Sequence, residues 1–171
     1  MGGPQAPANG ERLQEDDQMT NKRKISSPLY LVTAYWPCWQ CETKIPLAAL
    51  LAAKVDENSG EACMLSNITQ LPDEVLAFIQ QRVPSFKYAY SKTMASKYFA
   101  NTCPGCGEIQ GDYYLHSESG SPFFPFDKKA ARLLYMSIIP LAEPVVIDAT
   151  YRTGSSCDII LANAKREDED A

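Results

Sequence analysis

Hydrophobic and polar positions alternate along much of the chain, as half-buried strands require. Residues 29–35 and 97–102 combine β-branched with aromatic side chains, which favour strands. The same pattern predicts strands over residues 109–117, 145–151 and 157–161. The stretch that starts at Lys44 is ambiguous, because its leucines have helical spacing although it follows a turn that should belong to a hairpin; we favour a strand.

Two segments carry helical signals. Pro72 suits the first turn of a helix, two acidic residues follow it where the helix dipole favours negative charge, and one apolar stripe continues to residue 83. Asp127 is a suitable N-cap for a second helix over residues 127–136, which must end before Pro140. We therefore predict an α+β fold, a small antiparallel β domain with two helices.

Both ends of the chain differ in composition from its middle. Residues 1–24 are polar and lack apolar periodicity, so we expect a disordered leader there. Residues 165–171 are dominated by acidic side chains, which predicts a disordered acidic tail. Between them we expect a single zinc-ribbon-like domain over residues 25–164, with an inserted helical segment over residues 53–92.

Four of the six cysteines form two CxxC pairs, Cys38 with Cys41 and Cys103 with Cys106. A CxxC turn brings two thiolates to one edge of a metal ion, and four thiolates complete the tetrahedron of a structural zinc site. We therefore expect one structural Zn²⁺ held by these four cysteines. Because each pair lies between two predicted strands, the site should be a split zinc ribbon made of two hairpins whose turns are zinc knuckles.

The two pairs differ in their turns and lie far apart. Gly105 and Gly107 give the second turn the backbone freedom that it needs, whereas Glu42 stands where the first turn would take a glycine. The pairs are separated by far more than the roughly 15–20 residues typical of a compact ribbon. Loop closure costs rise only logarithmically with length, so this gap is compatible with one site. We interpret Cys63 and Cys157, which lie outside any CxxC, as ordinary thiols.

A CxxC pair can also serve as a thiol–disulfide redox centre. In such enzymes the first cysteine lies at the N-terminus of a helix that follows a strand, which lowers the pKa of its thiol. Neither pair has that arrangement in the predicted elements, and a thiol–disulfide oxidoreductase remains our second alternative. His116 shares one face of a predicted strand with Asp112, and we interpret these side chains as a polar, solvent-facing strand edge rather than a catalytic pair. We therefore expect no enzymatic activity.

The formal net charge is −5, but residues 75–107 contain no acidic side chain. Within this stretch, residues 86–99 interleave lysines with aromatic rings, which can neutralise phosphates and stack on unpaired bases. The candidate nucleic-acid-binding residues are Lys87, Lys92, Lys97, Tyr88 and Tyr90. Single-stranded nucleic-acid binding by this segment is our first alternative function.

The N-terminal residues contain no apolar run of a signal peptide, and no apolar stretch approaches the roughly 20 residues of a membrane span. We expect a cytoplasmic protein that does not bind membranes. Thiols stay reduced in that compartment, which favours metal binding by the cysteine pairs over disulfides.

Two motifs carry a resemblance to a known group. The chain contains Cys38-Trp-Gln-Cys41 and, later, Cys103-Pro-Gly-Cys-Gly-Glu-Ile-Gln-Gly-Asp112. Over roughly residues 29–125 it resembles uncharacterised bacterial proteins with CWxC and CPxCGxxQGD motifs. The resemblance implies a split zinc ribbon and carries no established activity. Taken together, we predict a non-enzymatic, zinc-stabilised interaction module that binds a protein partner.

Overall fold

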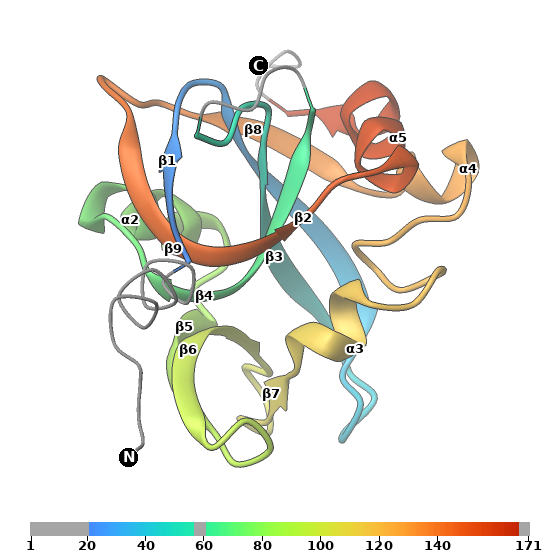
Figure 1. Ribbon diagram of the computed structural model, residues 1–171. Helices are drawn as coiled ribbons and strands as arrows, with labels where there is room; N and C mark the ends of the chain where they lie inside the picture. The colour runs from blue at the N-terminus through green and yellow to red at the C-terminus, as the bar shows by residue number, and fades with distance from the viewer. Residues whose placement is uncertain (1–20, 57–60, 168–171) are drawn as a thin grey trace, which may run out of the picture.

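The computed structural model describes residues 21–56 and 61–167. Within them the chain forms ten strands and four helices, shown in Figure 1. The strands are β1 (Lys22–Ile25), β2 (Leu29–Pro37), β3 (Lys44–Ala52), β4 (Cys63–Gln70), β5 (Phe86–Ser91), β6 (Ser96–Thr102), β7 (Ile109–Gln110), β8 (Tyr135–Ile139), β9 (Val145–Arg152) and β10 (Lys165–Arg166). The helices are α2 (Asp73–Arg82), α3 (Asp112–His116), α4 (Lys128–Ala131) and α5 (Ser155–Asn163).

The strands form one branched, mainly antiparallel sheet. The main path runs β1-β9-β4-β3-β2-β8-β10, and only the short β10 runs parallel to its neighbour, β8. A smaller set, β5-β6-β7, joins this path where β6 pairs with the end of β4 through Ile68 and Phe99. Figure 1 shows this smaller set below the main sheet, with α3 beside β7. The α+β class is confirmed, and the structure adds two short helices to the two that we predicted.

Strand β3 is the centre of the molecule and is buried on both faces. Ile45, Leu47, Ala49 and Leu51 lie in one hydrophobic core, whereas the side chains between them point into a second core on the other face of the sheet. Successive strand residues point to opposite faces, so one uniformly apolar strand can supply both cores. The strand that we favoured from Lys44 onwards is therefore confirmed.

Each core is closed by a helix. Val75 and Ile79 of α2 pack into the core that contains the even-numbered residues of β3, and the predicted helix at this position is confirmed. Cys157 and Ile160 of α5 pack into the opposite core. Figure 1 shows α2 and α5 on opposite sides of the sheet. In the described part of the chain, no helix is long and apolar enough to cross a membrane.

Two predicted strands are wrong. Only Ile109–Gln110 of the first pairs with β6, and the chain then turns into α3, where the Leu115 amide donates to the Gly111 carbonyl at 3.0 Å. Residues 157–161 lie in α5, because the spacing of Cys157 and Ile160 places both side chains on the core-facing side of a helix. In both cases packing against the core outweighs local β preference.

The second predicted helix is correct only at its start. Asp127 is the N-cap, and its Oδ1 accepts the Ala130 amide at 2.8 Å. The helix ends at Ala131, and the chain from Tyr135 onwards becomes β8, which pairs with β2 and places Met136 opposite Val32. The hydrogen bonds offered by β2 replace those of a continued helix.

The strands at both ends of the described chain extend beyond the boundaries that we expected. Lys22–Lys24 of the predicted leader belong to β1, which pairs with β9, and Lys165–Arg166 of the predicted tail form β10. The rest of the leader up to residue 20, and the tail from residue 168, lie outside the described residues. The predicted helical insertion, residues 53–92, contains α2 together with β4 and β5.

Candidate metal centre

The first CxxC pair occupies the turn between β2 and β3. The two strands stay in register up to Pro37 and Lys44, which lie opposite each other. Beyond them, the Cys38 amide donates to the Thr43 carbonyl at 2.8 Å, and the Glu42 amide donates to the Cys38 carbonyl at 2.9 Å. This turn, the first knuckle, lies on a hairpin as predicted.

The second pair repeats this turn between β6 and β7. The Cys103 amide donates to the Glu108 carbonyl, and the Gly107 amide donates to the Cys103 carbonyl, both at 2.9 Å. The residue after the second cysteine has a left-handed backbone in both turns, with φ of 65° at Glu42 and 85° at Gly107. Glu42 thus adopts the same backbone geometry as Gly107, although this conformation is strained for residues other than glycine.

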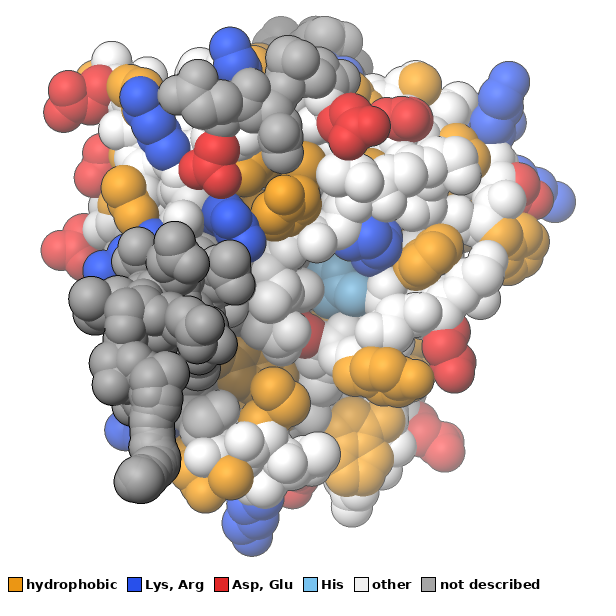
Figure 2. Space-filling view, viewed as in Figure 1, with side chains coloured by type: hydrophobic (Ala, Val, Ile, Leu, Met, Phe, Trp, Pro, Cys, Tyr) orange, Lys and Arg blue, Asp and Glu red, His pale blue; other side chains and the backbone are white. Residues whose placement is uncertain are grey.

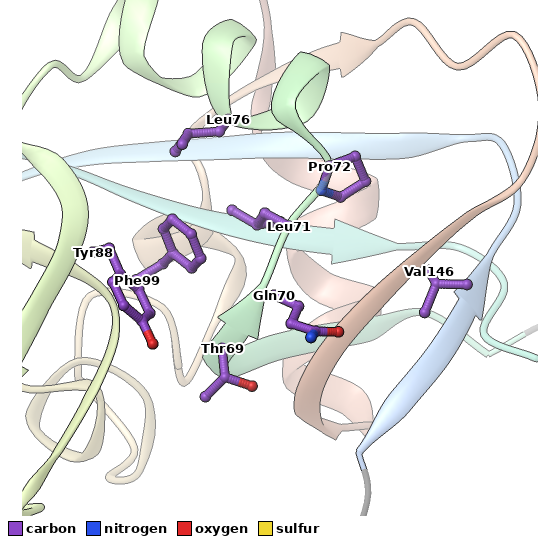
Figure 3. Close-up of a pocket in the computed structure, with 8 residues that line it drawn as sticks. All are labelled: Thr69, Gln70, Leu71, Pro72, Leu76, Tyr88, Phe99 and Val146. Atoms are coloured by element: carbon purple, nitrogen blue, oxygen red, sulfur yellow. The ribbon is translucent and has the colours of Figure 1, made fainter.

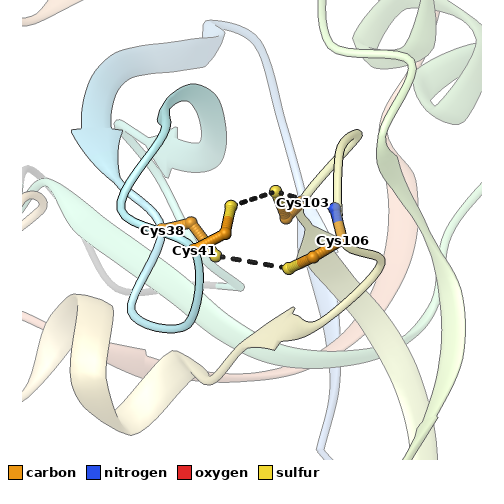
Figure 4. Close-up of side chains that lie close together, drawn as sticks. All are labelled: Cys38, Cys41, Cys103 and Cys106. Carbon is orange, nitrogen blue, oxygen red and sulfur yellow. Dashed lines mark hydrogen bonds between the residues drawn. The ribbon is translucent and has the colours of Figure 1, made fainter.

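The two turns face each other and bring four sulfurs together, as Figure 4 shows. The Cys38 and Cys106 sulfurs are 3.7 Å apart, and the Cys41 and Cys103 sulfurs are 3.6 Å apart. All four lie within 4.8 Å of one another. A tetrahedron with metal–sulfur bonds of about 2.3 Å has edges of about 3.8 Å. These distances exceed a disulfide bond of about 2.05 Å, and all four cysteines are free. The site that we predicted is therefore assembled as a group of four thiols close enough to bind one metal ion.

The two buried sulfurs, those of Cys38 and Cys103, receive N–H groups. Gly105 and Cys106 direct their amides at Cys103 Sγ at 3.3 and 3.4 Å, and the Gln40 amide lies 3.4 Å from Cys38 Sγ. Donors aimed at a sulfur stabilise its thiolate form. Both cysteines also belong to the core beneath β3, whereas Cys41 and Cys106 are exposed. The cluster therefore lies half in the core and half in solvent.

Thiolate formation within the cluster is uneven. Burial opposes ionisation of Cys38, but the backbone amides at Cys41 and Gln40 outweigh it and lower the pKa of this thiol to about 6. Hydrogen bonds with Thr43 lower the pKa of Cys41. The Glu108 backbone favours ionisation of Cys106, but burial and the three neighbouring sulfurs raise the pKa of Cys106 to about 12. A divalent cation relieves this competition, because its charge offsets the repulsion between the thiolates that bind it.

Gln110 is part of the site, and our sequence analysis did not single it out. Its side chain is buried, and its Nε2 donates to Cys38 Sγ at 3.3 Å across the two knuckles. Its Oε1 accepts the Trp39 amide at 3.2 Å, so one side chain of the second hairpin binds the first at two points. The signal was its place in the CPxCGxxQGD motif.

The other two cysteines are not part of the cluster. Cys63 lies on β4 and Cys157 on α5, both buried, and each directs its sulfur at a backbone carbonyl, Cys63 at Glu61 and Cys157 at Arg152. Burial raises the pKa of Cys63 to about 11, which keeps this thiol protonated. Both fit our interpretation as ordinary thiols.

The candidate nucleic-acid-binding residues do not form one surface. Tyr88, Tyr90 and Lys97 lie on one face of the β5–β6 hairpin, since Tyr90 pairs with Lys97, and the Lys97 ammonium lies 5.9 Å from the Tyr88 ring. Lys87 points to the opposite face, and Lys92 lies in the turn beyond β5. The five residues are all exposed, but only three of them share a face.

A shallow apolar pocket adjoins this face, and Figure 3 shows its lining. Tyr88 and Phe99 form one side of it, with their rings 4.9 Å apart, and Leu71 and Leu76 contribute from α2 and the segment before it. The Tyr88 ring therefore packs partly against its neighbours, whereas the Tyr90 ring is not part of this pocket.

The expected polar strand edge at Asp112 and His116 is wrong. Both residues lie in α3 and are buried, at 8% and 7% exposure. The His116 ring stacks on Phe123 at 5.2 Å, and burial lowers the pKa of His116 to about 3, so the ring is neutral. Burial raises the pKa of Asp112 to about 7. These are buried titratable groups beside the second knuckle rather than a solvated edge.

Neither knuckle has the surroundings of a redox CxxC. Cys41 is followed by β3 and Cys106 by β7, so neither pair begins a helix. The closest sulfur contacts join the two knuckles to each other and do not lie within one pair. Comparison of the chain with protein-family models, with curated proteins and with solved structures found no match.

Proposed function

We propose that the four-cysteine cluster holds one structural zinc ion and that the protein is a zinc-stabilised, non-enzymatic interaction module. The observation that carries the proposal is the pair of sulfur–sulfur distances of 3.6 and 3.7 Å between two knuckles from distant parts of the chain. Four thiolates in a tetrahedron suit zinc better than the harder ions magnesium and calcium, which prefer oxygen ligands.

A zinc ion with four thiolate ligands has no open position for a substrate or a water molecule. Its role here is to fasten the tip of the β2–β3 hairpin to the turn between β6 and β7. The ring of Trp39 lies beside this junction and is half exposed, and Tyr113 on the adjoining α3 is exposed as well. Exposed aromatic side chains on a rigid support are typical of surfaces that bind a partner protein.

The test is metal analysis of the purified protein, together with a count of reactive thiols. One zinc per chain is expected. A strong chelator should make the four cluster thiols reactive towards a thiol reagent, whereas the buried Cys63 and Cys157 should react only after unfolding. The Cys41→Ser variant should lose the metal, whereas Cys63→Ser and Cys157→Ser should retain it. Protein that contains no metal and remains unchanged in a chelator would contradict the proposal. If such protein also reduced insulin disulfides, it would be a thiol–disulfide oxidoreductase instead.

A second candidate function is binding of single-stranded nucleic acid by the β5–β6 hairpin. It is favoured by one observation, that Tyr90 and Lys97 form a cross-strand pair on an exposed face next to Tyr88. The ring of Tyr90 would stack on a base while Lys97 neutralises a phosphate.

This second function is tested by fluorescence anisotropy with a labelled oligonucleotide. Binding should weaken as salt increases and should be lost in the Lys97→Glu variant. The Lys87→Glu variant changes the charge equally on the opposite face and should bind nearly as well as the wild type. Absence of binding at low salt would remove this candidate.

We also infer a cytoplasmic location, because a zinc site of this kind needs reduced thiols.

A further inference from the structure

A hollow of about 840 Å³ opens beside the second knuckle. Its walls come from five places in the chain: Trp39 of the first knuckle, β4 at Ser66 and Asn67, the tip of the β5–β6 hairpin, the second knuckle at Gly107–Ile109, and the helix α3. In Figure 2, hydrophobic side chains gather on this face below the pale blue histidine. The volume lies within the range of small-ligand sites, about 300–1,000 Å³.

Asp112 lies in this hollow as its one buried acid. Its Oδ2 accepts the Asn67 amide at 2.7 Å, and its own amide donates to the Tyr98 hydroxyl at 3.4 Å. Asn67 has a left-handed backbone, φ 50°, where the β4–β9 pairing is irregular. A strained residue thus presents its amide to the carboxyl group, which fixes the position of that group.

No cation of the described residues balances Asp112. The half-buried Arg152 donates to the carbonyls of His116 and Phe123 instead. His116 also lines the hollow, is neutral, and has its Nδ1 buried without a hydrogen-bond partner. A buried carboxyl group with neither an ion pair nor full hydrogen bonding costs several kcal/mol. Such a group is typical of a ligand-binding site.

The walls around Asp112 are aromatic and held in place. The Trp39 indole donates to the Ile109 carbonyl at 2.8 Å, and the Tyr114 hydroxyl accepts the Trp36 indole N–H at 3.3 Å. Tyr90, Tyr98 and Tyr113 also belong to the lining. The Trp39 and Tyr114 rings are therefore positioned before a ligand arrives, which lowers the entropic cost of binding.

We propose that this hollow binds a primary alkylammonium group, such as the end of a lysine side chain, with the ammonium on Asp112 and the alkyl chain between the aromatic rings. The faces of Trp and Tyr rings attract cations, and a buried carboxylate is the natural counter-ion. The hollow has two acids, Asp112 and Glu108, against one base, Lys92. This balance disfavours phosphate and favours a cation. The inference rests on the proposed function, since it specifies the chemical group through which a partner would bind that module.

The test is a two-dimensional NMR titration of the zinc-loaded protein with butylammonium, with Nα-acetyl-lysine methylamide, and with 1-butanol as the neutral control. The Trp39 indole N–H and the Asn67 amide report on the hollow. Saturable shifts of both signals are expected with the two ammonium probes and not with butanol. An Asp112→Asn variant keeps an acceptor for the Asn67 amide but loses the charge, so it should bind at least about tenfold more weakly.

The two ammonium probes separate the sources of the ligand. Tighter binding of the lysine derivative indicates a protein side chain, and equal affinities indicate a small free amine. A matched Tyr88→Ala variant changes a ring outside the hollow and should bind as the wild type does.

Several results would overturn the assignment. These are equal binding of butanol, unchanged affinity in Asp112→Asn, or saturable shifts with a single-stranded oligonucleotide in place of the ammonium probes. Zinc content is measured on the same samples. A folded protein that binds no zinc when zinc is supplied would refute the proposed function, whereas a zinc-loaded protein that does not bind ammonium would refute only this inference.

Discussion

The left-handed residue that follows each CxxC gives the sharpest test of the knuckle geometry. Glu42 and Gly107 occupy equivalent positions, yet one carries a side chain and the other does not. A residue other than glycine costs about 1–2 kcal/mol in this conformation. Glycine in turn loses about 0.5–1 kcal/mol more on folding, because its unfolded chain is freer. Glu42→Gly should therefore stabilise the protein by about 0.5–1 kcal/mol, the difference between these two costs.

The reverse change at the second knuckle should have the opposite sign. A Cβ added at Gly107 meets no atom within 4 Å, so Gly107→Ala introduces backbone strain without a steric clash. It should destabilise the protein by about 0.5–1 kcal/mol for the same reasons. The two turns have the same pattern of backbone hydrogen bonds. The two substitutions therefore measure the same conformational cost, once as a gain and once as a loss of stability.

Urea unfolding at a fixed, saturating concentration of free zinc measures both effects, with tryptophan fluorescence as the probe. The slope of the unfolding free energy with urea should stay unchanged, so that the midpoint reports stability. Glu42 is also an acid beside a cluster that is anionic when it binds zinc, and its removal alone could stabilise the site. Glu42→Ala is the control, since it removes the charge but keeps the Cβ. If Glu42→Gly is no more stable than Glu42→Ala, the backbone argument is refuted.

Three further outcomes follow from buried polar groups. Asn101→Ala should cost about 2–4 kcal/mol in urea unfolding, because it leaves the Ala48 amide and carbonyl without their bonds of 2.7 and 2.9 Å; a loss below about 1 kcal/mol would contradict this. Gln110→Ala should weaken metal affinity about 10–100-fold in competition with a chromophoric chelator, since its N–H on Cys38 is lost, and unchanged affinity would exclude that role. Burial raises the pKa of Asp112 from its ordinary 3.8 to about 7, so the folded chain keeps a proton that the unfolded chain has released, and the wild type loses stability as the pH rises from about 4 to 7. Relative to wild type, Asp112→Asn should gain on the order of 2–4 kcal/mol between pH 4 and pH 8, and parallel pH profiles of the two proteins would refute the shift.

The amino-acid sequence was informative where one face of an element meets solvent. The helix α2 has one apolar stripe and flanking acids, and its position was predicted closely. The strand β3 was ambiguous because both of its faces are buried, which removes the alternation that distinguishes a strand. Only its place after the first knuckle favoured the correct choice.

The elements that were predicted wrongly are short segments that pack at the edge of a core. In α3, the spacing of Asp112, Tyr114 and His116 fits a strand, yet the buried pair Asp112 and His116 is also four residues apart, which fits one face of a helix. No local signal separates these alternatives. The contact that decides is the stacking of His116 on Phe123, and the chain reaches Phe123 only after the following turn.

The four clustered cysteines could be identified as candidate metal ligands because CxxC spacing is a local signal, whereas their surroundings are not local. Gln110 crosses from one hairpin to the other, so its contact with Cys38 depends on the docking of the two knuckles. The hollow around Asp112 likewise depends on five separate segments that meet only in the folded chain.

The attachment of β6 to the main sheet has a consequence for the metal-free protein. That strand meets β4 through the single pair of Ile68 and Phe99, and the Asn101 side chain binds the backbone of β3 close by. Neither contact involves a cysteine or a residue of the two knuckle turns. Removal of the ion should therefore loosen only the knuckles. Hydrogen–deuterium exchange should accelerate in the two turns, while the amides of β3 remain protected. Occupancy of the cysteine cluster would then control how rigidly the neighbouring aromatic surface is presented, and zinc supply would tune recognition without unfolding the domain.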